Sequence, residues 1–350
     1  EPENFEKIRK IMLPKDYLAY RLSGSFCTDV SDASGMLLMD VKNRCWSKEM
    51  LKICGITEEQ LPRLYESYEV VGTLKPEIAE ELGLSAGVKV IAGAGDNAAA
   101  AVGTGTVGDG MCNISLGTSG TIFISSSTFG VDQNNALHSF AHADGYYHLM
   151  GCMLSAASCN KWWNEEILKT KDFAAEQEGI RKLGENNVFY LPYLMGERTP
   201  HLDPDCRGVF FGLSAIHTKA HLLRAVMEGV SYSLSDCNDI LQEMGVQVDE
   251  MMACGGGGKS PIWRQMLSDL YDCQVKTVHQ SEGPALGVAI LAGVGCGIYE
   301  SVEKACEELI SVNKCSEPVE ADVKKYYQYH QLYKRLYGNL KESYKELAAL

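Results

Sequence analysis

The sequence predicts an α/β fold, and three of its features carry that prediction. Strand-like and helix-like segments alternate along the chain, as they do in α/β proteins. The segment 217–244 has apolar residues spaced by three and four, which is the pattern of an amphipathic helix. A strand, a glycine-containing turn and a helix follow one another at 89–105 and again at 250–272. Because 350 residues exceed the usual size of one domain, we expect two domains.

The predicted elements of the first part are short. Apolar residues near helical spacing predict a helix over 1–22, which Gly24 ends. The segments that follow are a polar loop leading into an apolar strand (28–40), a short helix from Trp46, another short helix within 72–87, and the strand, turn and small-residue helix of 89–105. Glycine density then rises near Thr106 to Gly110, where a new sheet is expected to start. We therefore place the two domains at 1–108 and 109–350.

The second part has longer elements. Two β-rich runs around a Gly-Thr-Ser-Gly turn predict a hairpin over 111–127. Beyond it we expect strands at 147–150, 188–194 and 273–278, and helices at 153–168, 217–244 and 284–294, in addition to the strand, glycine loop and helix of 250–272. The last predicted helix, 319–347, carries a stripe of tyrosines and other apolar residues, which we expect to pack against a domain face.

Composition argues against several classes of protein. The formal net charge of −14 disfavours a broad nucleic-acid surface, which needs clustered Lys and Arg. No apolar run approaches the ~20 residues of a membrane helix, and the polar first residues carry no signal-peptide pattern. The 13 cysteines are scattered without a CxxC pair, which indicates free thiols in a cytoplasmic protein instead of disulfides or a zinc site. No residues have the spacing of a metal-ligand set.

The segment AGAGDNAAAAVG (92–103) contains the first candidate for chemistry. Gly93 and Gly95 allow a sharp turn, after which Asp96 lies at the start of a helix of small residues. A carboxylate in that place can approach a substrate hydroxyl without steric hindrance and act as a general base. The alternative is structural, because Asp is also a preferred helix N-cap. The local pattern leaves both roles open.

Two glycine-rich segments are candidates for binding a nucleotide. The turn SLGTSGT (115–121) exposes backbone N–H groups and hydroxyls that suit phosphate oxygens, although it lacks the GK[ST] ending of a Walker A loop. The four glycines 255–258, with Lys259 and Ser260 after them, join a strand to a helix N-terminus that favours an anion. A base or ribose could lie against this bare backbone. The structural alternatives are a tight hairpin and a flexible loop.

A further segment, 193–213, is dense in Gly, Pro, Arg and Asp and is expected to form a long ordered loop. Such loops often carry function, but Glu197 and Arg198 within it could equally form a structural ion pair.

The motifs occur in the order found in the FGGY carbohydrate kinases, and the chain resembles the xylulokinase branch of that family most closely. The resemblance extends over nearly the whole chain. The matching segments are PKDYLAYRLSG (14–24), TDVSDASGMLLMDVKNRCWS (28–47), GAGDNAAAAVG (93–103), SLGTSGT (115–121), GERTPH (196–201), GVFFGLSAIHTKAHLLRAVME (208–228) and GGGGKSPIWRQMLSD (255–269).

The resemblance implies two actin-like (ribonuclease H-like) domains with a nucleotide cleft between them, and ATP-dependent phosphorylation of a sugar hydroxyl, most closely that of D-xylulose. It implies Asp96 as the catalytic base and Asn97 beside it as a sugar contact. It also implies Mg²⁺ as the companion of ATP. The helix at 154–163 is similar to another ATP-lining segment, with Ala156 and Lys161 as candidates. The implied ATP site consists of Gly117, Thr118, Ser119, Gly256, Gly257, Gly258, Lys259 and Ser260.

The sequence departs from the family pattern at its start. The family opens with an Asp-Gly-Thr phosphate hairpin, followed by a Met-His pair that contacts the sugar, and neither is found here. We therefore expect an incomplete first domain, which a missing N-terminal segment would complete. The expected partners are a sugar and ATP, without nucleic acid or membrane, and a homodimer is left open.

Two alternatives remain for the function. One is a sister kinase that acts on ribulose, gluconate, glycerol or another polyol. The other is a non-catalytic actin-like nucleotide-binding module. The pair Asp96–Asn97 favours a kinase, because a binding module needs no base directed at a substrate hydroxyl.

Overall fold

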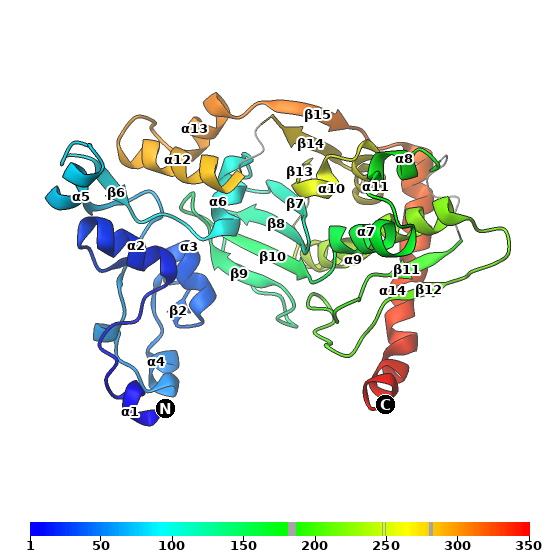
Figure 1. Ribbon diagram of the computed structural model, residues 1–350, viewed down its shortest axis with the longest axis horizontal. Helices are drawn as coiled ribbons and strands as arrows, with labels where there is room; N and C mark the ends of the chain where they lie inside the picture. The colour runs from blue at the N-terminus through cyan, green and yellow to red at the C-terminus, as the bar shows by residue number, and fades with distance from the viewer. Residues whose placement is uncertain (181–186, 247, 249, 280–282) are drawn as a thin grey trace.

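The computed structural model describes residues 1–180, 187–246, 248, 250–279 and 283–350. A mixed seven-stranded sheet forms its centre, with the strand order β15-β14-β13-β7-β8-β10-β9 (Figure 1). Strands β7, β13 and β14 run parallel, whereas β7 and β8 form the predicted antiparallel hairpin. The α/β class is therefore confirmed. The strands are β7 (Cys112–Leu116), β8 (Gly120–Ser126), β9 (His138–Ala141), β10 (Tyr147–Met153), β13 (Glu250–Cys254), β14 (Gln274–Val278) and β15 (Val312–Ser316).

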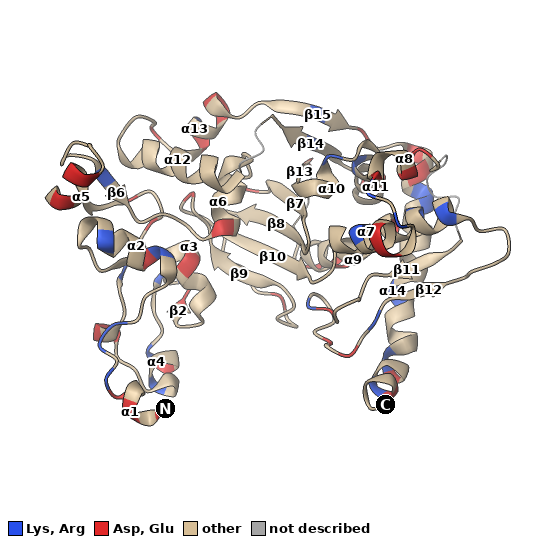
Figure 2. Ribbon diagram, viewed as in Figure 1, with Lys and Arg blue, Asp and Glu red and all other residues tan. Residues whose placement is uncertain are grey.

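The main hydrophobic core lies between this sheet and the helices of the second part. Strands β7 to β10 carry no charged residue, and they stand out as an uncharged block in Figure 2. Buried residues of β7, β8 and β10 share one cluster with those of α9, α11 and α14. The other elements here are α7 (Ala157–Trp162), a π-helix (Trp163–Ile167), α8 (Phe173–Gln177), β11 (Phe189–Leu191), β12 (Val209–Phe211), α9 (Lys219–Glu243), α10 (Gly255–Gly258), α11 (Pro261–Tyr271) and α14 (Glu320–Ala348).

The C-terminal helix α14 packs against α9, as its apolar stripe predicted. Tyr326, Tyr333 and Leu336 are buried in the main core. The hydroxyl of Tyr326 donates to Oε1 of Glu228 on α9 at 3.0 Å. The buried face of this helix is therefore part of the main core.

The first part consists of short elements around small two-stranded sheets. The predicted single helix over 1–22 is wrong, because the segment forms α1 and, after a break, α2. Pro14 opens α2 and disfavours a helical conformation at Leu13, which has an extended ψ of 159°. The elements are α1 (Pro2–Phe5), α2 (Pro14–Ser23), β1 (Cys27–Asp29), α3 (Val30–Ala33), β2 (Met39–Asp40), β3 (Cys45–Trp46), α4 (Lys48–Cys54), β4 (Arg63–Tyr65), β5 (Val70–Thr73), α5 (Pro76–Glu81), β6 (Lys89–Ile91) and α6 (Asp96–Gly103), with 3₁₀ turns at Ser34–Met36 and Glu58–Gln60.

Two late helices, α12 (Gly283–Gly295) and α13 (Val302–Leu309), lie beside the first part of the chain (Figure 1). Helix α12 packs on α6 with the two backbones in close contact. A Cβ atom at Gly103 would lie 1.8 Å from the carbonyl oxygen of Gly283, and one at Gly287 would lie 1.9 Å from that of Ala99. The small residues of α6 are therefore required by this close packing.

Other differences from the predictions concern short or polar elements. Strands β9 and β15 and helix α13 were not predicted; four of the five residues of β15 are exposed and polar residues dominate it, so its sequence resembles a loop. The four glycines 255–258, for which a flexible loop was the structural alternative, form a single helical turn, α10. The predicted helix over 153–168 is α7 continued by the π-helix. Among the helices of the described residues, none is both long and apolar enough to cross a membrane.

Candidate functional site

Asp96 is the first residue of α6, and Gly95 is the N-cap of that helix. The proposed N-cap role of Asp96 is therefore wrong. Its side chain is exposed, and Oδ1 accepts hydrogen bonds from the backbone N–H of Asn97 at 2.7 Å and from the Asn97 side-chain amide at 3.1 Å. Asp96 therefore presents a carboxylate at the exposed start of a helix, held by hydrogen bonds from Asn97. A carboxylate that is exposed and positioned in this way is suitable as a general base.

A buried hydrogen-bond network holds the turn before Asp96. The Asp29 carboxylate accepts from the hydroxyls of Ser31 and Ser67, both of which are buried. The Ser31 hydroxyl accepts in turn from the backbone N–H of Gly95 at 3.0 Å. Gly93 has a φ of +81°, which favours glycine at that position. Residues some sixty positions apart in the sequence thus fix where α6 begins.

Asp96 lines a cavity of about 690 Å³, here called the Asp96 pocket. Two further charged side chains, Lys15 and Asp32, line it too, and neither was predicted as a site residue. Asn97, predicted as a sugar contact, is not among the lining residues and bonds to Asp96 instead. The pocket is lined by Pro14, Lys15, Asp32, Gly93, Ala94, Gly95, Asp96, Ala99, Pro284, Ala285 and Val288.

The charged side chains in and around the Asp96 pocket lie close enough to change one another's pKa. Lys15 Nζ lies 2.8 Å from Asp16 Oδ1, 2.9 Å from Asp29 Oδ1 and 3.9 Å from Asp32 Oδ2. Burial lowers the pKa of Lys15, but the nearby Asp29 and Asp16 carboxylates outweigh it and raise that pKa overall. Burial, opposed by Lys15 and reinforced by the surrounding carboxylates, raises the pKa of Asp32 to about 6. The pocket therefore contains a permanent cation and a carboxyl group that titrates close to neutrality.

The predicted phosphate hairpin is fastened to the start of α7. The Gly117 carbonyl accepts from the backbone N–H of Ala157 at 2.8 Å, and the Thr118 carbonyl accepts from that of Ala156 at 3.0 Å. The hydroxyl of Ser158 donates to the Thr118 carbonyl at 2.8 Å. The turn is thus anchored through its carbonyls.

Most of the predicted ATP residues line a second cavity of about 770 Å³, here called the Thr118 pocket. Ser119 and Gly258 are the predicted residues that do not line it; the Ser119 hydroxyl donates to the Leu154 carbonyl instead. The lining residues are Leu116, Gly117, Thr118, Ala157, Ser158, Asn160, Lys161, Phe173, Ala174, Gln177, Gly256, Gly257, Lys259, Ser260, Pro261 and Trp263.

The glycines of α10 differ in what surrounds them. A Cβ at Gly256 would meet nothing within 4 Å, whereas one at Gly257 would lie 2.7 Å from Leu116 Cβ and 3.0 Å from the Trp263 ring. Gly256 is therefore the glycine whose bare backbone faces open space, and Gly257 is a packing position. Ser260 caps α11 and donates to Gln177 Oε1 at 2.7 Å.

Part of the Thr118 pocket could not be found from the sequence. Phe173 and Gln177 belong to the short helix α8, which carries no motif. Of the two candidates in the 154–163 segment, Lys161 lines the pocket, and Ala156 is fully buried elsewhere. The apolar spacing of 153–168 located this segment but not its register.

The loop 193–213 lines neither pocket. Glu197 Oε1 accepts from the backbone N–H groups of Leu154 and Arg198, and the Arg198 guanidinium bonds to His138. Within the described residues these two side chains form no ion pair, so that interpretation is wrong. Burial raises the pKa of Glu197 to about 7.

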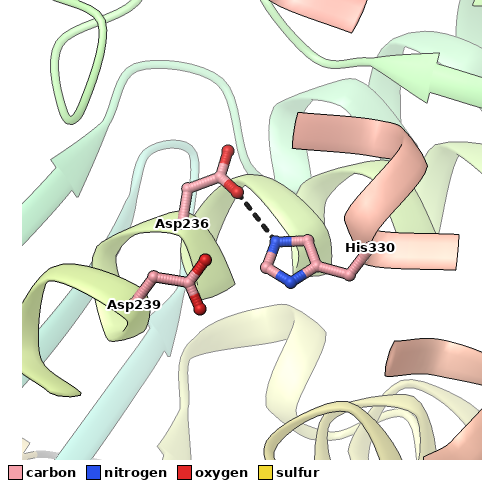
Figure 3. A group of neighbouring side chains, drawn as sticks. All are labelled: Asp236, Asp239 and His330. Atoms are coloured by element: carbon pink, nitrogen blue, oxygen red, sulfur yellow. Dashed lines mark hydrogen bonds and ion pairs between the residues drawn. The ribbon is translucent and has the colours of Figure 1, made fainter. Parts of the chain in front are cut away.

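A third group of titratable residues lies between α9 and α14 (Figure 3). Asp236, Asp239 and His330 place one ligand atom each within 4.8 Å of one another. His330 Nε2 bonds to Asp236 Oδ1 at 2.7 Å, and Lys334 Nζ lies 2.8 Å from Asp239 Oδ2. Asp236 and Asp239 thus each have a partner on α14, and these pairs join α9 to α14.

Comparison with known proteins identifies related sequences over both parts of the chain. The N-terminal domain of the FGGY family of carbohydrate kinases matches residues 1–103, and the C-terminal domain of that family matches residues 112–296. A xylulose kinase from Escherichia coli (strain K12) is 42% identical over 347 residues, which are 97% of this chain and 70% of that protein.

Solved structures are similarly close in fold. The ligand-bound xylulose kinase from Lactobacillus acidophilus matches with a TM-score of 0.93 at 26% identity, over 99% of this chain and 71% of that one. A gluconate kinase from the same organism matches with a TM-score of 0.93 at 27% identity, over the same shares. The fold alone therefore does not separate the two substrates.

Proposed function

The chain belongs to the FGGY family of carbohydrate kinases, and we propose that it transfers the γ-phosphoryl group of ATP to D-xylulose, giving D-xylulose 5-phosphate. The observation that carries the reaction type is the pairing of two cavities, one with an exposed carboxylate and one lined by the nucleotide motifs. The identity of the sugar is supported by the xylulose kinase that is 42% identical to this chain.

Asp96 is the proposed catalytic base. Its carboxylate would accept the proton of the sugar hydroxyl as that oxygen attacks the γ-phosphorus. The backbone N–H and the side-chain amide of Asn97 hold the carboxylate in place through Oδ1, and Oδ2 is the proposed acceptor of the substrate proton. Asn97 is proposed to act through this contact and at the sugar.

Lys15 and Asp32 are proposed to bind the sugar beside Asp96. Both line the Asp96 pocket, where Asp32 offers acceptor oxygens and Lys15 a positive charge to a polyhydroxylated ligand. Lys15 is held by Asp16 and Asp29, so its position is set before the sugar binds. Pre-organised polar groups lose little entropy when the ligand arrives.

The Thr118 pocket is the proposed ATP site. Thr118 and Lys259 would contact the phosphates, and the bare backbone of Gly256 allows the ribose to approach. Phe173 offers an aromatic surface to the adenine base, and Gln177 an amide. Ser119 and Gly258 remain proposed contacts through the backbone of their turns.

We propose that Mg²⁺ accompanies ATP. The ion prefers carboxylate and phosphate oxygens, and the Asp96 pocket offers the carboxylates of Asp32 and Asp96, so the donor set fits. When bound, the ion would neutralise charge on the phosphate oxygens.

Two further proposals concern the domains and the location of the protein. We propose domains at 1–108 and 109–350, which is supported by the start of the main sheet at Cys112. We also propose a cytoplasmic location.

Steady-state kinetics with different acceptors test the proposed substrate. We expect kcat/KM to be highest for D-xylulose among D-xylulose, ribulose, gluconate and glycerol. A higher kcat/KM for gluconate would assign the protein to the activity named for the Lactobacillus acidophilus gluconate kinase. Nucleotide binding without transfer to any of these sugars would favour the non-catalytic module.

A further inference from the structure

A third cavity of about 710 Å³, here called the Arg264 cavity, adjoins the other two. It opens at the carboxyl ends of the parallel strands β7, β13 and β14, where α/β sheets commonly bind ligands. It shares Gly256 and Lys259 with the Thr118 pocket, and Pro284 with the Asp96 pocket. A ligand in it would therefore contact walls of both neighbouring pockets.

Among the described residues, the charged side chains that line this cavity are all basic. They are Lys259, Arg264 and Lys314, with His279 beside them, and no Asp or Glu is among the described lining residues. This is notable in a chain whose formal net charge is −14. Cations that line a cavity with low-dielectric walls create a positive potential in the space that they enclose.

Arg264 is the buried member of this group. Only 5% of the residue is exposed, and burial lowers the pKa of its guanidinium. Nη1 donates to the carbonyls of Gly258 at 2.9 Å and Lys259 at 3.0 Å, but Nε is buried without a hydrogen-bond partner. Within the described part of the chain, no carboxylate pairs with this guanidinium. A buried cation without a counter-charge is costly, and an anion in the cavity would relieve that cost.

We propose that the Arg264 cavity binds the phosphoryl group of a small molecule. Arg264 and Lys314 hold the anion, and Lys259 links it to the nucleotide pocket. A planar guanidinium and two ammonium groups suit phosphate oxygens, and the volume is that of a small-ligand site. Two sources share this chemistry, namely the phosphate chain of the bound nucleotide and a separate phosphorylated molecule. The proposal does not depend on which sugar the enzyme phosphorylates.

Binding of inorganic phosphate to the full-length protein tests this inference without turnover. Thermal unfolding is followed against phosphate concentration at constant ionic strength, so that screening does not vary. We expect a phosphate-dependent rise in Tm for the wild type. Lys314→Gln should weaken phosphate affinity about tenfold, the effect of losing one charge-assisted contact, and Arg264→Gln should abolish binding.

The matched control is Lys324→Gln, because Lys324 is an exposed lysine of α14 that pairs with Glu320 outside the cavity. It should bind phosphate as the wild type does. Lys314 is also exposed, so its variant remains informative if Arg264→Gln does not fold.

A second titration contains a saturating non-hydrolysable ATP analogue. Phosphate binding that persists identifies a separate phosphorylated ligand, and competitive displacement identifies the nucleotide's phosphate chain. Either result supports a phosphoryl site. The inference is overturned if phosphate does not stabilise the wild type, or if Lys314→Gln and Arg264→Gln bind it as well as Lys324→Gln does. A protein that fails to phosphorylate D-xylulose but passes this test would refute only the proposed function.

Discussion

Replacing Asp32 with Asn should stabilise the protein above about pH 6, where the native carboxyl is ionised, and have little effect below about pH 4. Burial, reinforced by neighbouring carboxylates and opposed by Lys15, raises the pKa of Asp32 from 3.8 to about 6. The folded state therefore binds this proton more tightly than the unfolded chain does. The free energy of unfolding is then largest below about pH 4 and falls as the pH rises through about 6. An Asn side chain stays neutral and avoids this loss.

The magnitude follows from the change in pKa and the exposure of the side chain. The difference between 3.8 and about 6 corresponds to at most about 3 kcal/mol in the free energy of unfolding. The Asp32 side chain is 32% exposed, so solvent screening reduces this value. We expect Asp32→Asn to raise the free energy of unfolding by about 1 kcal/mol at neutral pH and above.

Urea unfolding of both proteins between about pH 4 and pH 8 measures this difference. Asp40→Asn is the matched control, because hydrogen bonds from Asn43 lower the pKa of Asp40 and its ionised form is favoured. Its replacement should give no stabilisation at any pH. The reasoning is refuted if Asp32→Asn destabilises the protein at pH 8, or if its gain is the same at every pH.

The remaining predictions concern catalysis and nucleotide binding. Asp96→Asn should lower kcat by about 10²–10⁴ while ATP affinity, measured by calorimetry, stays the same; normal turnover would exclude Asp96 as the base. Gly256→Val should weaken ATP binding with little change in Tm, because its side chain would enter open space. Gly257→Val should instead lower Tm by overpacking against Leu116 and Trp263, at a cost of about 1–3 kcal/mol. If the two glycine variants change ATP binding and Tm in the same way, Gly256 and Gly257 do not have the different roles proposed for them.

Local sequence patterns were sufficient to predict much of the fold. The apolar spacing of three and four located α9 to within two residues, and the Gly-Thr-Ser-Gly turn located the β7–β8 hairpin. Such signals depend on residues close in sequence, so they survive without knowledge of the rest of the chain. The short edge strand β15 could not be predicted, because exposed polar residues carry no periodicity. Pro14 was a local signal that the prediction over 1–22 overlooked.

The candidate site, like the fold, could be predicted from the sequence only in part. The sequence by itself determined that Asp96 begins a helix of small residues and that glycine turns follow β7 and β13, since a motif lies within a few positions. Only the tertiary structure decided that Lys15 and Asp32 join Asp96, and that Arg264 has no acidic partner among the described residues. It also decided that Gly256 faces open space whereas Gly257 is packed. Contacts between residues tens of positions apart depend on how the elements pack, and no local pattern records that packing.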